Sequence, residues 1–295
     1  MQAPADRPWP APAKLNLFLH ITGRRTDGYH LLQTVFQFLD YSDELHFTVR
    51  SDGAIRRTSE LPGVPAETDL VVRAAQLLQR ESGTHLGADI SVTKRLPLGG
   101  GLGGGSSDAA TVLVALNQLW RTGLTEEQLA ILGLKLGADV PVFVHGLATW
   151  AEGVGEQFTP VELPEPWFVV LVPAVSVSTA EIFGAPELTR DSPPITIRAF
   201  LTGEGGNVCE SVVRNRYPAV AAALDWLGQH RCARMTGTGA CVFAAFDSEA
   251  HARQVFATRP AGLEGFVARG CNRSPLLARL ADAEASSTET QWFTD

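Results

Sequence analysis

The chain has 295 residues, of which 45% are apolar and 19% charged, and its net charge is −8 at pH 7. This length allows one large hydrophobic core or two smaller ones, and we expect two. The acidic balance argues against nucleic acid or a membrane as a partner, because no basic field is present to hold many phosphate groups, although local backbone N–H groups can still bind a small anion.

The cysteines and the apolar runs bear on the compartment. The four cysteines include no C-x-x-C pair, which favours reduced thiols over a disulfide framework or a zinc site. No apolar run reaches the roughly 18 residues of a membrane span, and the first residues lack the pattern of a secretory signal. We therefore expect a cytoplasmic protein.

The first predicted strand carries polar residues on one face. After a proline-rich leader, residues 14–21 alternate, with Leu15 and Ile21 on one face and Lys14 and Asn16 on the other. Either a solvated strand face or a functional pair is compatible with this pattern. The sequence next predicts a turn-rich loop over 22–30 with a turn at Asp27-Gly28, and strands over 31–39 and 44–50 joined by a turn at 41–43. A helix that is capped by Thr68-Asp69 and runs through Arg80 follows, and then a strand over 88–93.

A glycine-rich segment over residues 97–110 dominates the first half. Six glycines occupy the seven positions 99–105, where each costs backbone entropy and adds no side chain to a core. Ser106, Ser107 and Asp108 follow and are expected to cap a helix with apolar residues at helical spacing. A glycine loop between a strand and a helix N-terminus is an anion site, because its N–H groups and the helix dipole favour negative charge. The alternative is a flexible linker.

Three phosphate-loop patterns can be compared with this segment. A Walker A loop ends in Gly-Lys-[Ser/Thr], and the lysine is missing here. The Rossmann pattern fits Gly99, Gly101 and Gly104, but the acids about 20 residues later lie in a predicted helix rather than at a strand end. The protein-kinase loop turns between two strands, whereas this one opens a helix. A phosphate loop that ends in two serines remains.

The rest of the chain divides at a proline-rich stretch over 160–166. Before it, Thr125 and Gln128 form a capping box for a helix that stops at Gly137, and Asp139 is expected to cap a short helix with Pro141 in its first turn. After it, the pattern predicts helices over one antiparallel sheet. These elements are a strand over 167–172, helices near 179–183 and over 208–227, short strands on either side of 237–239, a helix over 248–258 and a strand over 265–268.

Five motifs occur in an order that resembles the 4-diphosphocytidyl-2-C-methyl-D-erythritol kinases, a family of the GHMP small-molecule kinases. They are Pro-Ala-Lys-Leu-Asn-Leu-Phe-Leu at 12–19, Asp-Gly-Tyr-His at 27–30, the glycine loop, Gly-Ala-Asp-Val-Pro at 137–141 and Thr-Gly-Thr-Gly-Ala at 236–240. The resemblance implies an α+β fold whose N-terminal half is α/β. It implies a ribosomal S5 domain 2-like ATP-binding domain over 1–160, a ferredoxin-like domain over 161–295 and a site in the cleft between them.

The resemblance also implies residue roles. Lys14 and Asp139 would be catalytic, in an ATP-dependent phosphorylation of the 2-hydroxyl of 4-diphosphocytidyl-2-C-methyl-D-erythritol. The expected ATP contacts are Lys94, which would lie near the adenine, and Pro97, Leu98, Gly99, Gly100, Gly101, Leu102, Gly103, Gly104, Gly105, Ser106 and Ser107. The expected substrate contacts are Asn16, Tyr29, His30, Phe36, Thr179 and Phe183. ATP would act with Mg²⁺, whose ligands the sequence does not assign, in a monomer or weak homodimer.

Two other functions are compatible with the same loop. A homoserine- or mevalonate-type kinase would share the loop and differ in its acceptor. A nucleotide-binding regulator would have the fold without the chemistry, but it would not need both Lys14 and Asp139. The family often has asparagine where this chain has Asp69, before the helix near the adenine.

Overall fold

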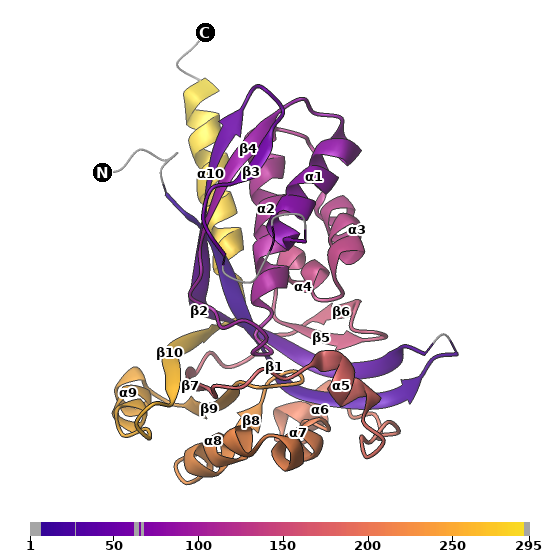
Figure 1. The fold of residues 1–295 in the computed structure, drawn as a ribbon, viewed down its shortest axis with the longest axis vertical. Coiled ribbons are helices and arrows are strands. Elements are labelled where there is room, and N and C mark those ends of the chain that lie inside the picture. Colours follow the sequence, from indigo (N-terminus) through magenta and orange to yellow (C-terminus); the bar gives the residue numbers. More distant parts are fainter. Residues whose placement is uncertain (1–6, 27, 62–64, 66–67, 292–295) are drawn as a thin grey trace.

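A computed structural model describes residues 7–26, 28–61, 65 and 68–291. Asp27 of the expected turn, the first six residues of the leader and the last four residues of the chain lie outside this part. Within it, two parts built of helices and strands lie one above the other in Figure 1. Most of the first half of the sequence and the last helix form the upper part, and the rest of the second half forms the lower part.

The first half is a sheet covered by helices. Strands β1 and β2 run antiparallel, β4 and β5 pair with β2, β3 runs parallel to β4, and β6 pairs with β5. The strands are β1 (Trp9–Arg24), β2 (His30–Arg50), β3 (Ile55–Arg57), β4 (Gly87–Thr93), β5 (Thr149–Glu152) and β6 (Gln157–Pro160). The helices are α1 (Leu70–Ser82), α2 (Gly104–Trp120), α3 (Glu126–Leu136) and α4 (Val140–His145).

The second half confirms the expected antiparallel sheet with helices over it. Its strands lie in the order β10-β7-β9-β8, and every pair is antiparallel. They are β7 (Trp167–Val172), β8 (Arg234–Met235), β9 (Val242–Phe246) and β10 (Glu264–Cys271). The helices are α5 (Thr179–Gly184), α6 (Ile197–Leu201), α7 (Glu210–Arg216), α8 (Pro218–Gly228), α9 (Glu249–Ala257) and α10 (Pro275–Gln291). No helix in the described residues is long and apolar enough to cross a membrane.

The turn expected at 41–43 is wrong, because β2 continues through it. Asp43 pairs with Ala11 of β1 and is fully buried. Its carboxylate accepts hydrogen bonds from the backbone N–H groups of Arg95 and Leu96, the latter at 2.8 Å. These tertiary partners outweigh the local turn preference of a Tyr-Ser-Asp sequence. In the same way, β1 begins at Trp9, so the end of the proline-rich leader, from Trp9 to Ala13, already belongs to the strand.

The helices also differ from expectation at several points. The helix expected over 208–227 is two helices, α7 and α8, because Pro218 has no N–H to continue the first and begins the second. Helix α2 begins at Gly104, so Ser106, Ser107 and Asp108 lie inside it rather than cap it. Helix α10 was not expected. The caps of α1 at Asp69 and of α3 at Thr125 are confirmed.

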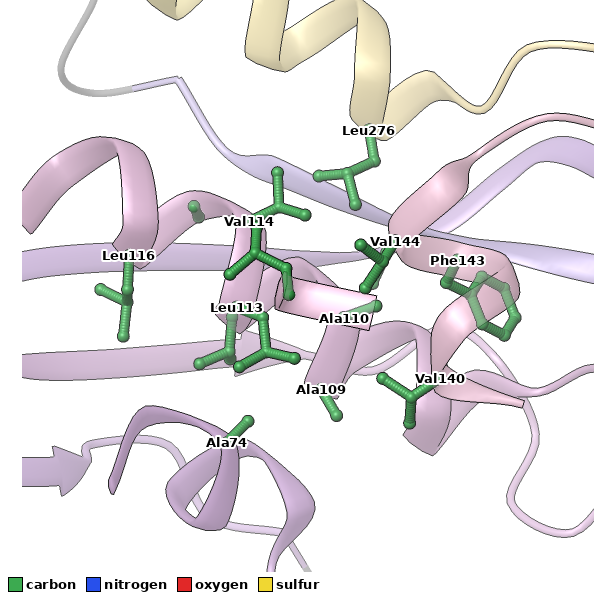
Figure 2. Packing of buried hydrophobic residues seen from close by; sticks show 14 of the residues in the cluster. Ala74, Ala109, Ala110, Leu113, Val114, Leu116, Val140, Phe143, Val144 and Leu276 are labelled. Carbon is green, nitrogen blue, oxygen red and sulfur yellow. The ribbon is translucent and has the colours of Figure 1, made fainter. Parts of the chain in front are cut away.

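The hydrophobic cores extend across the expected boundary near 160. The cluster in Figure 2 joins α2 residues such as Leu113 to Phe143 of α4 and to Leu276 of α10. Strand β1 contributes Trp9 to this cluster and Ile21 to the core of the second half. The chain therefore crosses between the two cores early, along β1, and again at its end, where α10 packs against β1 and α2.

Candidate active site

A cavity of about 960 Å³ lies where the glycine loop meets β1, β2, α5 and the turn before α4. It is lined by all of the predicted catalytic, ATP-binding and substrate-binding residues except Leu102 and Ser107. The structure thus brings together segments that are far apart along the chain. Because the lining includes Gly237 and Thr238, the Gly-Thr-Gly motif of the second half also reaches this site.

The glycine loop follows a path that side chains would block. Gly99, Gly101 and Gly103 have φ angles of 68°, 77° and 76°, in the left-handed region that favours glycine. A Cβ on Gly101 would lie 2.4 Å from the carbonyl oxygen of Thr236, and one on Gly103 would lie 2.6 Å from the ring of Phe143. The loop leads directly into the N-terminus of α2, a 17-residue helix. This arrangement supports an anion at the loop.

Leu102 and Ser107, both expected among the ATP contacts, point away from the cavity. Leu102 is 1% exposed and packs in an apolar cluster, while its backbone oxygen accepts a hydrogen bond from the backbone N–H of Lys14 at 3.0 Å. Ser107 is fully buried, and its Oγ has no hydrogen-bond partner among the described residues. Ser106, in contrast, lines the cavity. Of the two serines, Ser106 has the hydroxyl placed to meet a ligand.

Lys14 and Asp139 face one another in the cavity. The Lys14 Nζ lies 3.6 Å from the Asp139 Oδ2, with the lysine buried and 43% of the aspartate side chain exposed. The ammonium also donates to the Asn16 Oδ1 and, at 3.0 Å, to the carbonyl oxygen of Gly101. Burial lowers the pKa of Lys14, and the charge of Asp139 partly offsets this effect. A buried cation beside an accessible carboxylate is an arrangement suited to phosphoryl transfer.

The expected capping role of the Asp139 side chain is wrong. Asp139 precedes α4 with φ −85° and ψ −9°, and its carboxylate makes no capping hydrogen bond in the described part of the chain. Pro141 lies in the first turn of this helix as expected. The carboxylate is therefore available to the cavity.

Asn16 holds Lys14 in place. It is 4% exposed, its Nδ2 donates to the Thr34 Oγ1 at 3.0 Å, and its backbone N–H donates to the Thr236 Oγ1 at 2.9 Å. Thr236 in turn donates to the carbonyl oxygen of Gly101 at 3.2 Å. The polar face of β1 is therefore a buried network, and the alternative of a solvated strand face is wrong. Thr34 was not singled out from the sequence, whereas Thr236 is the first residue of the Thr-Gly-Thr-Gly-Ala motif.

Lys94 belongs to a buried ion cluster beneath the loop. Its Nζ donates to the carboxylates of Asp43 and Asp108, the second at 2.8 Å. Burial raises the pKa of Asp108 to about 7, with Lys94 opposing this shift and Asp43 adding to it. Burial by itself would lower the pKa of Lys94, but the two carboxylates outweigh it and raise that pKa. Lys94 lines the cavity, and its ammonium already has two anionic partners.

An aromatic pocket forms the other end of the cavity. The rings of His30 and Phe183 stack with centroids 5.1 Å apart and an angle of 22° between their planes. Tyr29 is 66% exposed, and the Thr179 Oγ1 lies 3.0 Å from the Thr238 Oγ1. Arg190 donates to the His30 Nε2 at 3.2 Å. No sequence pattern indicated this arginine, because it lies in an irregular segment between α5 and α6.

Comparison with known proteins agrees with this geometry. Residues 69–147 match the GHMP kinases N terminal domain and residues 194–262 the GHMP kinases C terminal domain. A 4-diphosphocytidyl-2-C-methyl-D-erythritol kinase of Nitrosococcus oceani is 64% identical over 91% of this chain and 96% of its own length. One of Alkalilimnicola ehrlichii is 61% identical over 96% of this chain and 97% of its own.

Solved structures show the same relationship. A crystal structure of 4-(cytidine 5'-diphospho)-2C-methyl-D-erythritol kinase superposes with a TM-score of 0.79 at 32% identity, covering 89% of this chain and 98% of that one. A mevalonate kinase with a TM-score of 0.67 and 14% identity, covering 90% of this chain and 99% of that one, shares the fold. The fold is thus the two-domain α+β fold of the GHMP kinases. The chain is a kinase that belongs to the 4-diphosphocytidyl-2-C-methyl-D-erythritol kinase family.

Proposed function

We propose that this cavity transfers the terminal phosphoryl group of ATP to the 2-hydroxyl of 4-diphosphocytidyl-2-C-methyl-D-erythritol, giving the 2-phosphate and ADP. The reaction belongs to the non-mevalonate route to isoprenoids. The observation that carries the proposal is the pairing of Lys14 with Asp139 at 3.6 Å, in one cavity with the glycine loop and an aromatic pocket.

Asp139 is the group proposed to accept the proton of the 2-hydroxyl. A carboxylate within hydrogen-bond reach of an alcohol contributes about 10²–10⁴ in rate by general base catalysis. Phosphoryl transfer otherwise depends on positioning and on neutralising charge around a loose transition state. The Lys14 ammonium, which is hydrogen-bonded to Asn16 and to the carbonyl oxygen of Gly101, is proposed to offset that charge.

The glycine loop and the start of α2 are proposed to bind the phosphates of ATP. A Cβ on Gly137 would lie 3.8 Å from the Ser106 Oγ, so this hydroxyl lies beside the turn that carries Asp139. Hydroxyl and carboxylate oxygens, together with phosphates, suit Mg²⁺, which takes few protein ligands and prefers oxygen. Ser106 is the residue that would hold the ion, which would supply neutralisation of phosphate charge when bound.

The aromatic pocket is proposed to bind the cytosine. Tyr29 and Phe183 offer flat faces for stacking a base, and His30 offers a polar edge. The remaining expected substrate contacts also line the cavity and are Thr179, Asn16 and Phe36. Because one chain carries all of these groups, we expect a monomer or weak homodimer to be active, in the cytoplasm where ATP is supplied.

The test is a panel of acceptor alcohols with ATP and Mg²⁺, followed by ADP release. We expect turnover with the cytidylyl substrate and little with homoserine or mevalonate. A preference for either of those alcohols would overturn the acceptor assignment. ATP binding without turnover on any alcohol would instead support a nucleotide-binding regulator.

A further inference from the structure

We propose that Arg190 is a positioning residue that fixes the tautomer of His30, so that His30 presents an N–H group to the substrate base and favours cytosine over uracil. This inference rests on the proposed function for its ligand, but its central claim concerns this chain alone. Arg190 does not itself line the cavity formed by the described residues.

The guanidinium of Arg190 joins two elements of the pocket. Its Nε donates to the His30 Nε2 at 3.2 Å, at the start of β2. Its Nη2 donates to the carbonyl oxygens of Phe183 and Ala185 at 2.8 Å and 2.7 Å, at the end of α5. Its Nη1 donates to the carbonyl oxygen of Leu188 at 3.0 Å. All three nitrogens are engaged, so the group is held in one orientation.

This contact determines where His30 carries its proton. A guanidinium has only donors, so the His30 Nε2 must be the acceptor. A neutral imidazole whose Nε2 accepts a hydrogen bond carries its proton on Nδ1. The neutral form is favoured because burial lowers the pKa of His30, and the positive charges of Arg190 and Arg24 lower it further. His30 is thus an Nδ1–H donor.

The orientation of the ring is fixed by the same arginine. Phe183 stacks on His30 with centroids 5.1 Å apart, and its own carbonyl oxygen is bound by Arg190. The donor edge of His30 and the aromatic face of Phe183 are therefore held relative to each other by a single side chain. Both residues line the cavity.

A fixed donor discriminates between the two pyrimidines. N3 of cytosine can accept a hydrogen bond from the Nδ1–H group of His30. N3 of uracil carries a hydrogen, so two donors would face one another and no hydrogen bond would form. The free-energy cost of leaving a buried donor without a partner exceeds the free energy gained when its hydrogen bond forms. The mismatch with uracil should therefore weaken binding strongly. An imidazole free to change tautomer would accept from uracil and lose this discrimination.

The experiment compares Arg190→Met with a matched variant, Arg216→Met. Arg216 pairs with Glu181 and Glu187, on and just after α5, rather than with His30. Long-range ¹H–¹⁵N spectra of histidine-labelled protein, assigned with His30→Gln, report the tautomer. Kinetics with cytidylyl and uridylyl substrates report KM, kcat and the preference between bases.

We expect His30 to be protonated on Nδ1 in the wild type and to become a tautomer mixture in Arg190→Met. We also expect KM for the cytidylyl substrate to rise about tenfold, kcat to stay within about twofold, and the base preference to fall about tenfold. Arg216→Met should leave the tautomer and the preference unchanged.

A wild-type His30 protonated on Nε2 overturns the proposal, and so does an Arg190→Met enzyme that keeps its base preference. If Arg190→Met fails to fold, as judged by thermal melting, the wild-type spectrum alone decides between the two tautomers. If the wild type does not phosphorylate the cytidylyl substrate, the proposed function fails, and the tautomer measurement still tests the role of Arg190.

Discussion

The Lys14 Nζ and the Asp139 Oδ2 lie 3.6 Å apart, although one residue is on β1 and the other precedes α4. The two differ sharply in environment, since the lysine is buried and the aspartate is partly exposed to the cavity. This asymmetry gives each group a separate task. The cation is held within the protein, and the carboxylate can reach a ligand.

Replacement of either member of this pair should stop turnover without preventing ATP binding. Asp139→Asn removes the proposed base and Lys14→Met removes the proposed cation, so we expect kcat to fall by about 10² or more in each variant. The measurement is coupled ADP release, with ATP affinity from calorimetry. Asp52→Asn, which alters an exposed ion pair with Arg50, is the control. Wild-type rates in both active-site variants would contradict the mechanism.

The value of kcat should fall at high pH, and this fall should begin at a lower pH than the pKa of an ordinary lysine would give. In the proposed mechanism the ammonium form of Lys14 is the active one. Because burial lowers the pKa of Lys14 below 10.5, activity should fall with rising pH before an ordinary lysine loses its proton. Asp139 raises this pKa. In Asp139→Asn the pH at which the residual kcat falls should therefore be lower still. The measurement is kcat against pH, at pH values where melting shows that the fold persists, and a fall that moves to higher pH would be contrary to this account.

Gly101→Ala should destabilise the protein. The residue has a positive φ of 77°, and a Cβ would lie 2.4 Å from the backbone oxygen of Thr236, which cannot swing aside as a side chain can. We expect a loss of about 2 kcal/mol or more in the free energy of unfolding. Gly105→Ala is the matched control. Gly105 lies within α2, and a Cβ there would lie 3.7 Å from the side chain of Leu70, an ordinary van der Waals distance. Equal melting temperatures for the two variants would argue against the tight packing of the loop.

The Asp43–Lys94–Asp108 cluster should make stability depend on pH. Asp108 keeps its proton in the folded chain up to about pH 7, whereas an unfolded aspartate loses it near pH 4. The folded state binds more protons over this interval, so stability falls as pH rises. Between about pH 6 and pH 8 the fall should be on the order of 1 kcal/mol.

Asp108→Asn should abolish this fall in stability between about pH 6 and pH 8, because the substitution leaves Lys94 and Asp43 as a pair of one cation and one anion. Denaturant unfolding at several pH values is the measurement. Asp225→Asn, which alters an exposed pair with Arg214, should keep the wild-type slope. A wild-type slope in Asp108→Asn would show that Asp108 does not titrate in this range.

Local sequence signals predicted the features that depend on short-range chemistry. Asp69 caps α1, Thr125 and Gln128 form a capping box, and the glycine loop leads into a helix. Each signal lies within a few residues of the structure that it specifies, so a single sequence suffices. The joint placement of Lys14 and Asp139 came from the order of motifs along the chain rather than from any one of them.

The errors have a different origin, in contacts between distant segments. Asp43 resembles a turn residue until Arg95 and Leu96 supply partners for its carboxylate. Ser107 resembles a phosphate contact until α2 begins at Gly104 and turns it inward. Arg190 gives no signal at all, because its role depends on His30 and Phe183 being brought together by the fold.

Strand β1 packs into four apolar clusters in turn, through Ala11, then Leu15, then Phe18, then Ile21. One strand is thus shared by both halves of the molecule, with Lys14 near the middle of its path. We expect an exchange of second halves between two relatives to disturb packing, because Ile21 would then face the core of the other protein while Ala11 stayed in its own. A chimera of two members of this family should therefore exchange β1 together with the segments that pack on it in both halves.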